Sequence, residues 1–286
     1  MTTRDFSTVT ELPGIGATRE QLSMLYTRYH LAARHCEGKA VLELACGAGL
    51  GLHYISRRAR HVVGGDIDEK NLRLAREINQ GQDRVTLCKL DAQSLPFAGR
   101  SFDTVILYEA LYYLPNPEEL VREVRRVLRA GGVLLICTVN KEWGGFNPSP
   151  GSVRYFSAAE LARLLEDTGF RVTIFGGFPD NPNSPMHRFV SALRKTAVRL
   201  RLIPKTMKGK QWLKRLFYGT LTPLRQVEEG MAPLAALKEL PANSGGSTFK
   251  VLYAVASVVK ESSVLTEVDS EGLFRKQGSP SGRTLA

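Results

Sequence analysis

The stretch Val41-Leu-Glu-Leu-Ala-Cys-Gly-Ala-Gly-Leu-Gly51 decides the fold. Apolar residues in its first half predict a buried strand, and the glycines at Gly47, Gly49 and Gly51 predict a tight turn that leads into a helix. A strand, a glycine turn and a helix start together allow backbone N–H groups to approach a nucleotide-like ligand closely. The stretch predicts a ligand-binding corner, although strand-to-helix corners without a ligand share this pattern.

Strands and helices alternate after this turn. Apolar patterning predicts strands at 40–45, 61–66, 84–91, 102–107, 133–138, 171–175 and 249–259, and helices at 50–59, 68–79, 117–128 and 157–168. Gly131-Gly132 is expected to cap the end of the third of these helices. Thr18 with Gln21, and Ser157 with Glu160, predict capping boxes, the first opening a helix that runs to about His35. The alternation predicts an α/β fold with a doubly wound, mostly parallel sheet.

Polar and glycine positions converge at one edge of this predicted sheet. Asp66 ends the second strand about twenty residues after the glycines, where doubly wound folds place an acid that binds ribose hydroxyls. Ligands of such sheets bind beyond the carboxyl ends of the strands. The residues expected there are Gly47, Asp66, Asp91, Tyr108 and Asn140.

These motifs resemble those of the class I S-adenosylmethionine (SAM)-dependent methyltransferases over residues 38–138, with a weaker similarity as far as residue 170. Glu43-Leu-Ala-Cys-Gly-Ala-Gly49 looks like the family's acidic-x-Gly-x-Gly-x-Gly loop, which cradles the amino-acid end of SAM. Ala45 replaces the first glycine, which the turn tolerates if φ stays negative there. The resemblance implies a seven-stranded sheet, SAM as cofactor, S-adenosylhomocysteine as product, and no metal.

The resemblance also assigns cofactor-binding roles, with Asp66 matching the ribose ligand and Asp91-Ala92 the pair that reads the adenine edge. The full set of matching positions is Glu43, Ala45, Gly47, Gly49, Asp66, Ile67, Asp91, Ala92 and Tyr108. The spacing disfavours other nucleotide sites. No glycine completes the pyrophosphate fingerprint of a dinucleotide dehydrogenase, and no lysine follows as in a phosphate-binding P-loop.

Because SAM carries its own leaving group, the protein must mainly position the acceptor, and a base is needed only for a hydroxyl or a protonated amine. Our candidates for catalysis are Glu109, His30 and Tyr112. Our candidates for substrate binding are Tyr26, Tyr29, Tyr113, Asn140 and Trp143. Tyr26, Arg28, Tyr29 and His30 fall on the N-terminal helix, which in many relatives closes over the ligands. Each aromatic residue could instead simply pack on the body.

Composition narrows the class of protein. The chain has 286 residues, 43% hydrophobic and 23% charged, as is ordinary for a soluble globular protein. The four cysteines (Cys36, Cys46, Cys88, Cys137) form no C-x-x-C pair, which disfavours a zinc site and favours a reduced, cytoplasmic setting. No signal peptide or membrane span is expected, because no apolar run is long enough.

The formal net charge of +11 is concentrated in one segment. Residues 181–227 contain eleven Lys and Arg and no acid, leaving 28 basic against 28 acidic residues elsewhere. Apolar residues recur there at helical spacing, so residues 180–246 are predicted to be a basic helical insertion before the last strand. Residues 186–218 would suit an anionic membrane surface at the inner membrane face. A cap over an acidic substrate, an RNA contact, or a helical insertion packed on the core are the alternatives.

The predicted organisation has four parts: an N-terminal arm and lid helix (1–37), the SAM-binding domain (38–179 with 247–260), the basic insertion (180–246) and a disordered tail (261–286). The favoured function is methyl transfer to an O or N acceptor on a small molecule, such as a sugar, a lipid-linked compound or another metabolite. The alternatives are an RNA or protein methyltransferase and a SAM-binding module without turnover. Nucleic acid is the less favoured partner, and either a monomer or a homodimer is expected.

Overall fold

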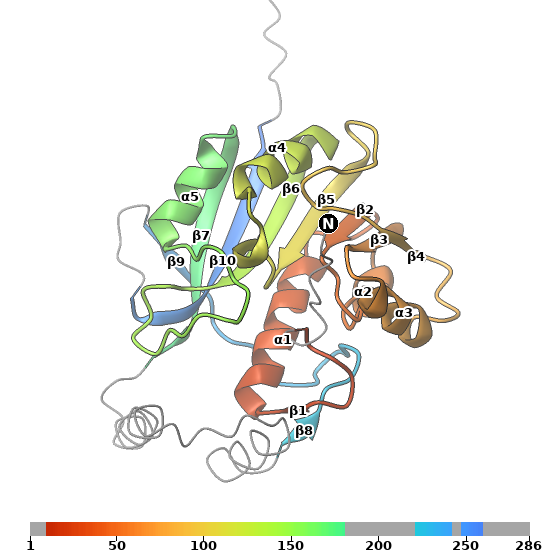
Figure 1. Ribbon diagram of the computed structural model, residues 1–286, viewed down its shortest axis with the longest axis horizontal. Coiled ribbons are helices and arrows are strands. Elements are labelled where there is room, and N and C mark those ends of the chain that lie inside the picture. Colours follow the sequence, from red (N-terminus) through yellow and green to blue (C-terminus); the bar gives the residue numbers. More distant parts are fainter. Residues whose placement is uncertain (1–9, 181–220, 242–246, 260–286) are drawn as a thin grey trace, which may run out of the picture.

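The computed structural model describes residues 10–180, 221–241 and 247–259. Within these residues, eight strands form one sheet in the order β4-β3-β2-β5-β6-β10-β7-β9 (Figure 1). Their bounds are β2 (Ala40–Leu44), β3 (His61–Asp66), β4 (Val85–Lys89), β5 (Phe102–Tyr108), β6 (Leu128–Val139), β7 (Phe170–Pro179), β9 (Lys238–Leu240) and β10 (Phe249–Val258). The first five strands in this spatial order are parallel, and β10 runs antiparallel between β6 and β7.

Helices cover both faces of the sheet, as the predicted doubly wound fold requires. The helices are α1 (Arg19–Ala33), α2 (Leu52–Ser56), α3 (Glu69–Ile78), α4 (Pro117–Val127) and α5 (Ala158–Glu166), with a short 3₁₀ turn at Leu111–Tyr113. Apolar residues of α4 and α5 form one core with one side of the sheet, and those of α1, α2 and α3 form the other. Successive residues of β2 alternate between these two cores.

Both predicted capping boxes are confirmed. The Thr18 side chain accepts a hydrogen bond from the backbone N–H of Gln21, whose own side chain accepts one from the N–H of Thr18. Ser157 and Glu160 make the same reciprocal pair at the start of α5. Each box satisfies backbone donors that have no partner inside the helix.

The predicted role of Gly131-Gly132 as a helix cap is wrong. Helix α4 already ends at Val127, and β6 begins at Leu128. The two glycines lie inside β6, where the pairing with β5 shifts register. Gly131 has φ 74°, and a Cβ on Gly132 would stand 2.9 Å from the carbonyl oxygen of Arg129. The glycines therefore accommodate an irregularity in a strand, which begins earlier than predicted.

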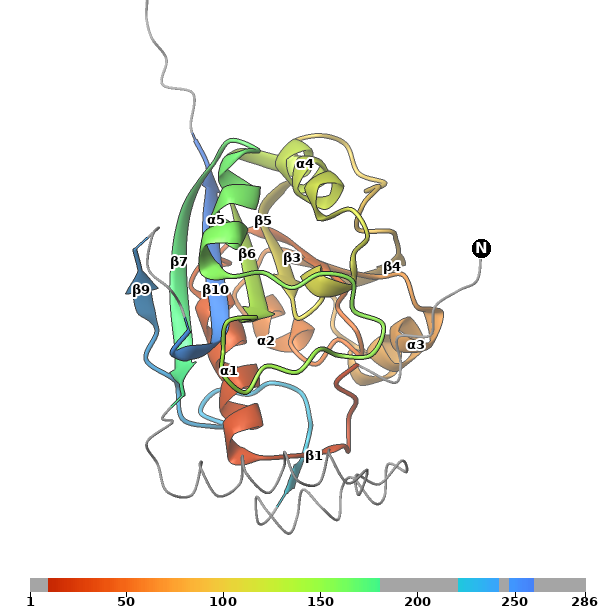
Figure 2. The same ribbon diagram turned by 60° about the vertical axis from the view of Figure 1, so that its left-hand side comes forward.

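The expectation of a helical insertion is also wrong for the part of it that is described. Residues 221–241 contain no helix but a loop with two short strands: β8 (Thr222–Pro223) pairs with β1 (Gly16–Ala17), and β9 adds an eighth strand to the seven expected, beside β7 at the sheet edge (Figure 2). Three prolines, Pro223, Pro233 and Pro241, lack the N–H that a helix interior needs. The proposed membrane segment 186–218 and the expected tail 261–286 lie outside the described residues.

Residues 224–237, which we name the strap, fasten α1 to its neighbours. The Glu229 carboxylate accepts hydrogen bonds from the hydroxyls of Tyr26 on α1 and Tyr54 on α2. Backbone bonds extend this fastening, from the N–H of Val227 to the Leu50 oxygen (2.8 Å) among others. Among the described residues, no helix is long and apolar enough to cross a membrane.

We predict that Glu229→Ala lowers the free energy of unfolding by about 1–2 kcal/mol, because two tyrosine hydroxyls lose a charged acceptor. Chemical denaturation would measure the change. The matched control is Glu228→Ala, which removes only an exposed ion pair to Arg225 at 3.8 Å and should change stability by less than about 0.5 kcal/mol. Equal effects of the two substitutions would contradict the fastening role of Glu229.

Candidate active site

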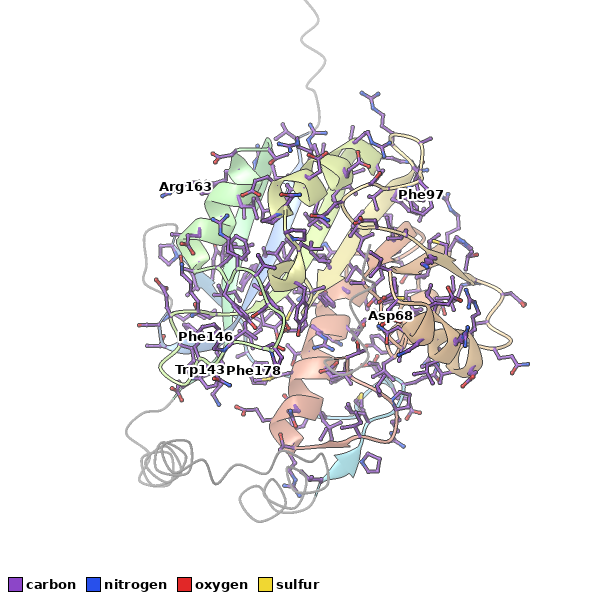
Figure 3. All side chains as sticks on the ribbon, viewed as in Figure 1. Asp68, Phe97, Trp143, Phe146, Arg163 and Phe178 are labelled. Carbon is purple, nitrogen blue, oxygen red and sulfur yellow. The ribbon has the colours of Figure 1, made fainter. Side chains whose placement is uncertain are left out.

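One large cavity lies at the carboxyl ends of β2, β3, β4 and β5, with a volume of about 1250 Å³. Pockets for a single small ligand usually measure about 300–1,000 Å³. Asp68, which caps the start of α3, and Trp143, on the loop after β6, both line this cavity, and both are labelled in Figure 3. The size of the cavity is sufficient for a cofactor and a second molecule together.

The glycine turn after β2 allows neighbouring helices to approach closely. Gly47 and Gly49 have φ values of 56° and 68°, in the left-handed region that favours glycine. A Cβ on Gly51 would stand 1.9 Å from the Tyr29 ring of α1. Tyr29 could not occupy its place if residue 51 carried a side chain. Gly47 lines the cavity, whereas Gly49 packs against α3 outside it.

Ala45 adopts a conformation opposite to the one expected from the sequence. Its φ is 52°, so the position of the family's first glycine is left-handed here too, and the expected negative φ is wrong. The turn must reverse direction directly after β2, and an alanine there carries a steric cost of about 1–2 kcal/mol. Ala45 lines the cavity in this strained form.

Asp66, at the end of β3, holds the cavity wall between the glycine turn and the start of α3 in place. Its carboxylate accepts hydrogen bonds from the backbone N–H groups of Gly47 and Asp68, both at 2.8 Å. Burial raises the pKa of Asp66, and these two N–H donors oppose that rise. One carboxylate thus ties the glycine turn to the start of α3. Three other predicted cofactor residues, Ile67, Asp91 and Ala92, line the same end of the cavity.

Glu43 lies behind the glycine turn, almost wholly buried. Its Oε1 atom accepts a 2.6 Å hydrogen bond from the Tyr29 hydroxyl, while Oε2 has no partner among the described residues. Burial raises the pKa of Glu43 to about 7, an effect that the Tyr29 hydrogen bond and the charge of Arg28 oppose. A buried carboxylate oxygen without a donor is costly unless a ligand donates to it.

Glu109 and Tyr112 meet where β5 ends. The Tyr112 hydroxyl donates to the Glu109 carboxylate at 3.1 Å, and the Cys137 thiol donates to it at 3.4 Å. Glu109 has φ 52°, a strained conformation for this residue type. Burial raises the pKa of Glu109 above its ordinary value. Both side chains line the cavity, as does Tyr108, so a carboxylate of raised basicity faces the space beyond the glycine turn.

Aromatic rings form the wall beyond Glu109. Tyr112 stacks on Tyr155 with ring centroids 4.6 Å apart, and the Tyr113 hydroxyl lies 2.6 Å from that of Ser149. Trp143 donates from its indole N–H to Asp180 at 2.8 Å. Tyr29, Tyr113 and Trp143, three of the five residues proposed for substrate binding, line the cavity.

Five predicted site residues do not line the cavity: Glu43 and Gly49, described above, and Tyr26, His30 and Asn140. Tyr26 and His30 lie on the face of α1 that contacts the strap: Tyr26 donates to Glu229, and His30 Nδ1 lies 3.8 Å from the same carboxylate. Asn140 is fully buried and donates to the backbone oxygen of Phe249 at 2.9 Å, so it joins β6 to β10. The structure does not bring Tyr26, His30 or Asn140 to the cavity, because helix phase and strand pairing direct these side chains elsewhere.

Two charged residues contribute to the site in ways that were not predicted from the sequence. Arg28, expected only as a lid residue, is buried, lines the cavity and forms an ion pair with Glu11. Its Nε atom has no partner among the described residues. Glu11 falls in a stretch without periodicity, where nothing in the sequence indicates a contact. The helical position of Arg28 on the same turn as Tyr29 could have suggested its orientation.

The residues present fit the SAM that the resemblance implies. Glu43 Oε2 and Arg28 Nε are buried polar atoms of opposite charge type, without partners among the described residues. Arg28 lines the cavity, and Glu43 lies behind the cavity-lining Tyr29, whose hydroxyl donates to it. An amino-acid group carries an ammonium and a carboxylate, which match these two atoms chemically. No cluster of three or more potential metal ligands occurs in the described ranges.

We predict that Ala45→Gly increases the free energy of unfolding by up to about 1 kcal/mol, because glycine removes the strain of the left-handed residue. Thermal denaturation would measure the change. Ala48→Gly is the matched control: Ala48 lies in the same turn without a positive φ, and its replacement should lower stability. A loss of stability in both variants would contradict strain at Ala45.

We predict a pH-dependent effect of Glu43→Gln. The folded-state pKa of Glu43, about 7, lies above the ordinary 4.5, so the native state holds a proton that the unfolded state releases. The stability that Glu43 contributes is complete at low pH and declines by up to about 3 kcal/mol as the pH rises to about 7. Glutamine does not titrate, so the variant should gain stability relative to the original protein between about pH 5 and about pH 8. Parallel stability curves from urea titrations would contradict this.

Part of the chain is similar in sequence to known proteins. Residues 42–136 match the family described as "Methyltransferase domain". A protein of Mycolicibacterium smegmatis named a "Probable S-adenosylmethionine-dependent methyltransferase" is 33% identical over 167 residues, covering 56% of this chain and 63% of that protein. The phthiotriol/phenolphthiotriol dimycocerosates methyltransferase 1 of Mycobacterium ulcerans is 39% identical over 113 residues, covering 37% of this chain and 41% of that protein.

The fold also has solved counterparts. The YcgJ protein of Bacillus subtilis superimposes with a TM-score of 0.53 at 18% identity, covering 82% of this chain and 99% of that one, which supports the fold alone. The chain spans less than two thirds of the length of the two curated relatives, from M. smegmatis and M. ulcerans. The strand order, the glycine turn with its carboxylates and the matched residues 42–136 together resemble those of SAM-dependent methyltransferases.

Proposed function

We propose that this chain transfers a methyl group from SAM to an O or N atom of a largely apolar small molecule, such as a lipid-linked metabolite. The observation that carries the proposal is a single cavity that joins the glycine turn to an aromatic wall, with Glu109 between them. Enzymes of this kind need a cofactor and an acceptor side by side, and the volume of about 1250 Å³ provides for both.

The cofactor half of the cavity runs from Ala45 to Asp91, and Glu43 lies behind Tyr29 at its edge. SAM supplies an activated methyl group and its leaving group, so the residues here need only hold it. Asp66 offers carboxylate oxygens toward ribose hydroxyls, and Ile67 and Ala92 offer apolar contacts to a base. Glu43 accepts from an ammonium through its unpartnered Oε2 atom.

The acceptor half is mainly apolar and aromatic, with Lys250 over the Trp143 ring as a charged member of its lining. Tyr112, Tyr113 and Trp143 line it, together with Val153, which is 52% exposed and extends the apolar surface to the solvent. An apolar lining that continues to an exposed residue suits a molecule with a hydrophobic tail that extends out of the cavity. The M. ulcerans relative is named for dimycocerosates, which are lipids, and this supports the same substrate class here.

Glu109 is the proposed general base. A hydroxyl or ammonium acceptor must lose a proton as it attacks the methyl carbon, and the raised pKa of Glu109 makes it a better proton acceptor than an ordinary carboxylate. Tyr112 donates to Glu109 and thereby orients it. Tyr112 is therefore a positioning residue for Glu109. The aromatic wall orients the acceptor.

A second candidate function is methylation of RNA or protein, for which the basic residues between 181 and 227 are the relevant feature. Most of that segment lies outside the described residues, as does the proposed membrane contact at 186–218. The aromatic character of the acceptor half favours a small apolar molecule over a polyanion. A SAM-binding role without turnover remains the third alternative.

The discriminating experiment incubates the full-length protein with methyl-labelled SAM and a fractionated cell extract. Label in the organic phase would support a lipid-linked acceptor, and label in the aqueous small-molecule fraction would support a sugar or another metabolite. Label in RNA or protein would support the second candidate. No transfer, with SAM binding retained, would contradict an enzymatic function and favour the binding module.

We predict that Glu109→Gln lowers kcat by about 10²- to 10⁴-fold, the usual contribution of a general base. SAM affinity, measured by calorimetry, should stay within about threefold. In the original protein the rate should rise with pH until the raised pKa of Glu109 is passed, and the variant should lose this dependence. An unchanged kcat, or the same pH profile in both proteins, would exclude Glu109 as the base.

A further inference from the structure

The ion pair between Arg28 and Glu11 has no role in the proposed chemistry, although both residues line the cavity. The Arg28 side chain is only 8% exposed, while that of Glu11, on the arm before α1, is 43% exposed. A buried guanidinium requires a partner of opposite charge. Glu11 provides that partner from a segment of the chain that is far less buried.

Two kinds of contact hold the arm, and they differ along its length. From Gly14 onward the backbone is fixed by hydrogen bonds to the strap: the N–H of Gly14 donates to the Leu224 oxygen (2.9 Å), and that of Leu224 to the Ile15 oxygen (2.8 Å). Before Gly14, the cavity-lining residues Thr10 and Glu11 are held by their side chains, which contact residues around the cavity. The Thr10 hydroxyl accepts from Asn71 at 3.2 Å, and its methyl group lies against Gly47. Thr10 thus lies over the glycine turn.

The charges at this end of the cavity match an amino-acid group. The ammonium and carboxylate of such a group are attached to one carbon, so a carboxylate must lie within a few ångströms of the ammonium that Glu43 accepts. The described cations that line the cavity are Arg28, Lys70, Lys89 and Lys250. Of these, Arg28 is the one whose charge acts on both Glu43 and Glu109, whereas Lys250 is paired with Glu20 at 2.6 Å. Arg28 is therefore the partner for the ligand carboxylate.

The fork of Arg28 is half occupied. Glu11 engages Nη2, and Nε on the same edge of the guanidinium has no partner among the described residues. A carboxylate binds an arginine edge most strongly through two parallel hydrogen bonds, here to Nε and Nη2. A ligand carboxylate that takes both donors must therefore displace Glu11.

We propose that Glu11 occupies on Arg28 the place of the cofactor carboxylate, so that the segment at residues 10–13 is an autoinhibitory plug that SAM must displace. The inference rests on the proposed function, since it requires SAM in this cavity. In the free protein the plug keeps the buried guanidinium paired. On binding, the ligand carboxylate takes over the edge of Arg28 and the arm is released from the glycine turn.

The test compares SAM binding to the full-length protein and to Glu11→Gln by isothermal titration calorimetry. The variant removes the competing charge, so we expect SAM to bind it about tenfold more tightly. 5′-Methylthioadenosine, which has the adenosine part of SAM but no amino-acid carboxylate, should bind both proteins within about twofold. Glu228→Gln, which removes a surface carboxylate away from the cavity, is the matched control and should leave both affinities unchanged.

Thermal stability provides a readout that is independent of affinity. Glu11→Gln leaves Arg28 without its charged partner, so the free variant should melt at a lower temperature, and saturating SAM should raise its Tm by more than it raises that of the original protein. Glu11→Asp, which keeps the charge on a shorter side chain, should give an intermediate SAM affinity. It also tests the proposal if the glutamine variant does not fold.

The outcomes separate this inference from the function on which it rests. SAM binding that is unchanged or weaker in Glu11→Gln would overturn the plug, and the weaker result would make Glu11 part of the bound site. An equal gain in affinity for SAM and methylthioadenosine would also overturn it, because the effect would not depend on the carboxylate. If neither SAM nor methylthioadenosine binds the original protein, the proposed function itself fails, and the plug with it.

Discussion

The rest of the site depends on the close approach of Tyr29 to the turn after β2. The absence of a side chain at Gly51 lets the ring enter, and its hydroxyl then reaches Glu43 at 2.6 Å. This one contact joins α1 to the carboxyl end of the sheet and places Arg28, the preceding residue, at the cavity. A helix held against a glycine turn by a buried hydroxyl–carboxylate bond is a rigid support for the groups that face a ligand.

Burial gives the cavity its electrostatic character. The pKa values of Glu43, Asp66 and Glu109 are all raised by desolvation, and Arg28 is the buried cation that opposes this effect at Glu43 and Glu109. Acids that hold protons more tightly than usual, next to unpartnered polar atoms, are typical of sites arranged for a ligand rather than for stability alone. The strained φ values of Ala45 and Glu109 at the ends of adjacent strands have the same implication.

The strap shows how a segment outside the matched residues 42–136 supports the site. Through Glu229 it fixes the outer face of α1 with Tyr26 and Tyr54, while Tyr29 and Arg28 face inward. Tyr26 and His30 were expected at the cavity because the N-terminal helix of the family that the chain resembles closes over the ligands. At 100° per residue, however, neighbouring side chains on a helix point in different directions. The position of the strap determines which side chains of α1 face outward and which face the cavity.

The sequence by itself was sufficient to predict the doubly wound sheet, the capping boxes at Thr18 and Ser157, the glycine turn, and the position of Asp66 and Asp91 at strand ends. Hydrophobic period, caps and turns are properties of neighbouring residues, so they can be interpreted without the fold. Four features became known only from the tertiary structure: the left-handed φ of Ala45, the burial of Asn140, the eighth strand β9, and the pairing of Arg28 with Glu11. Each of these depends on residues distant in the sequence that packing brings together, and no local pattern records such contacts.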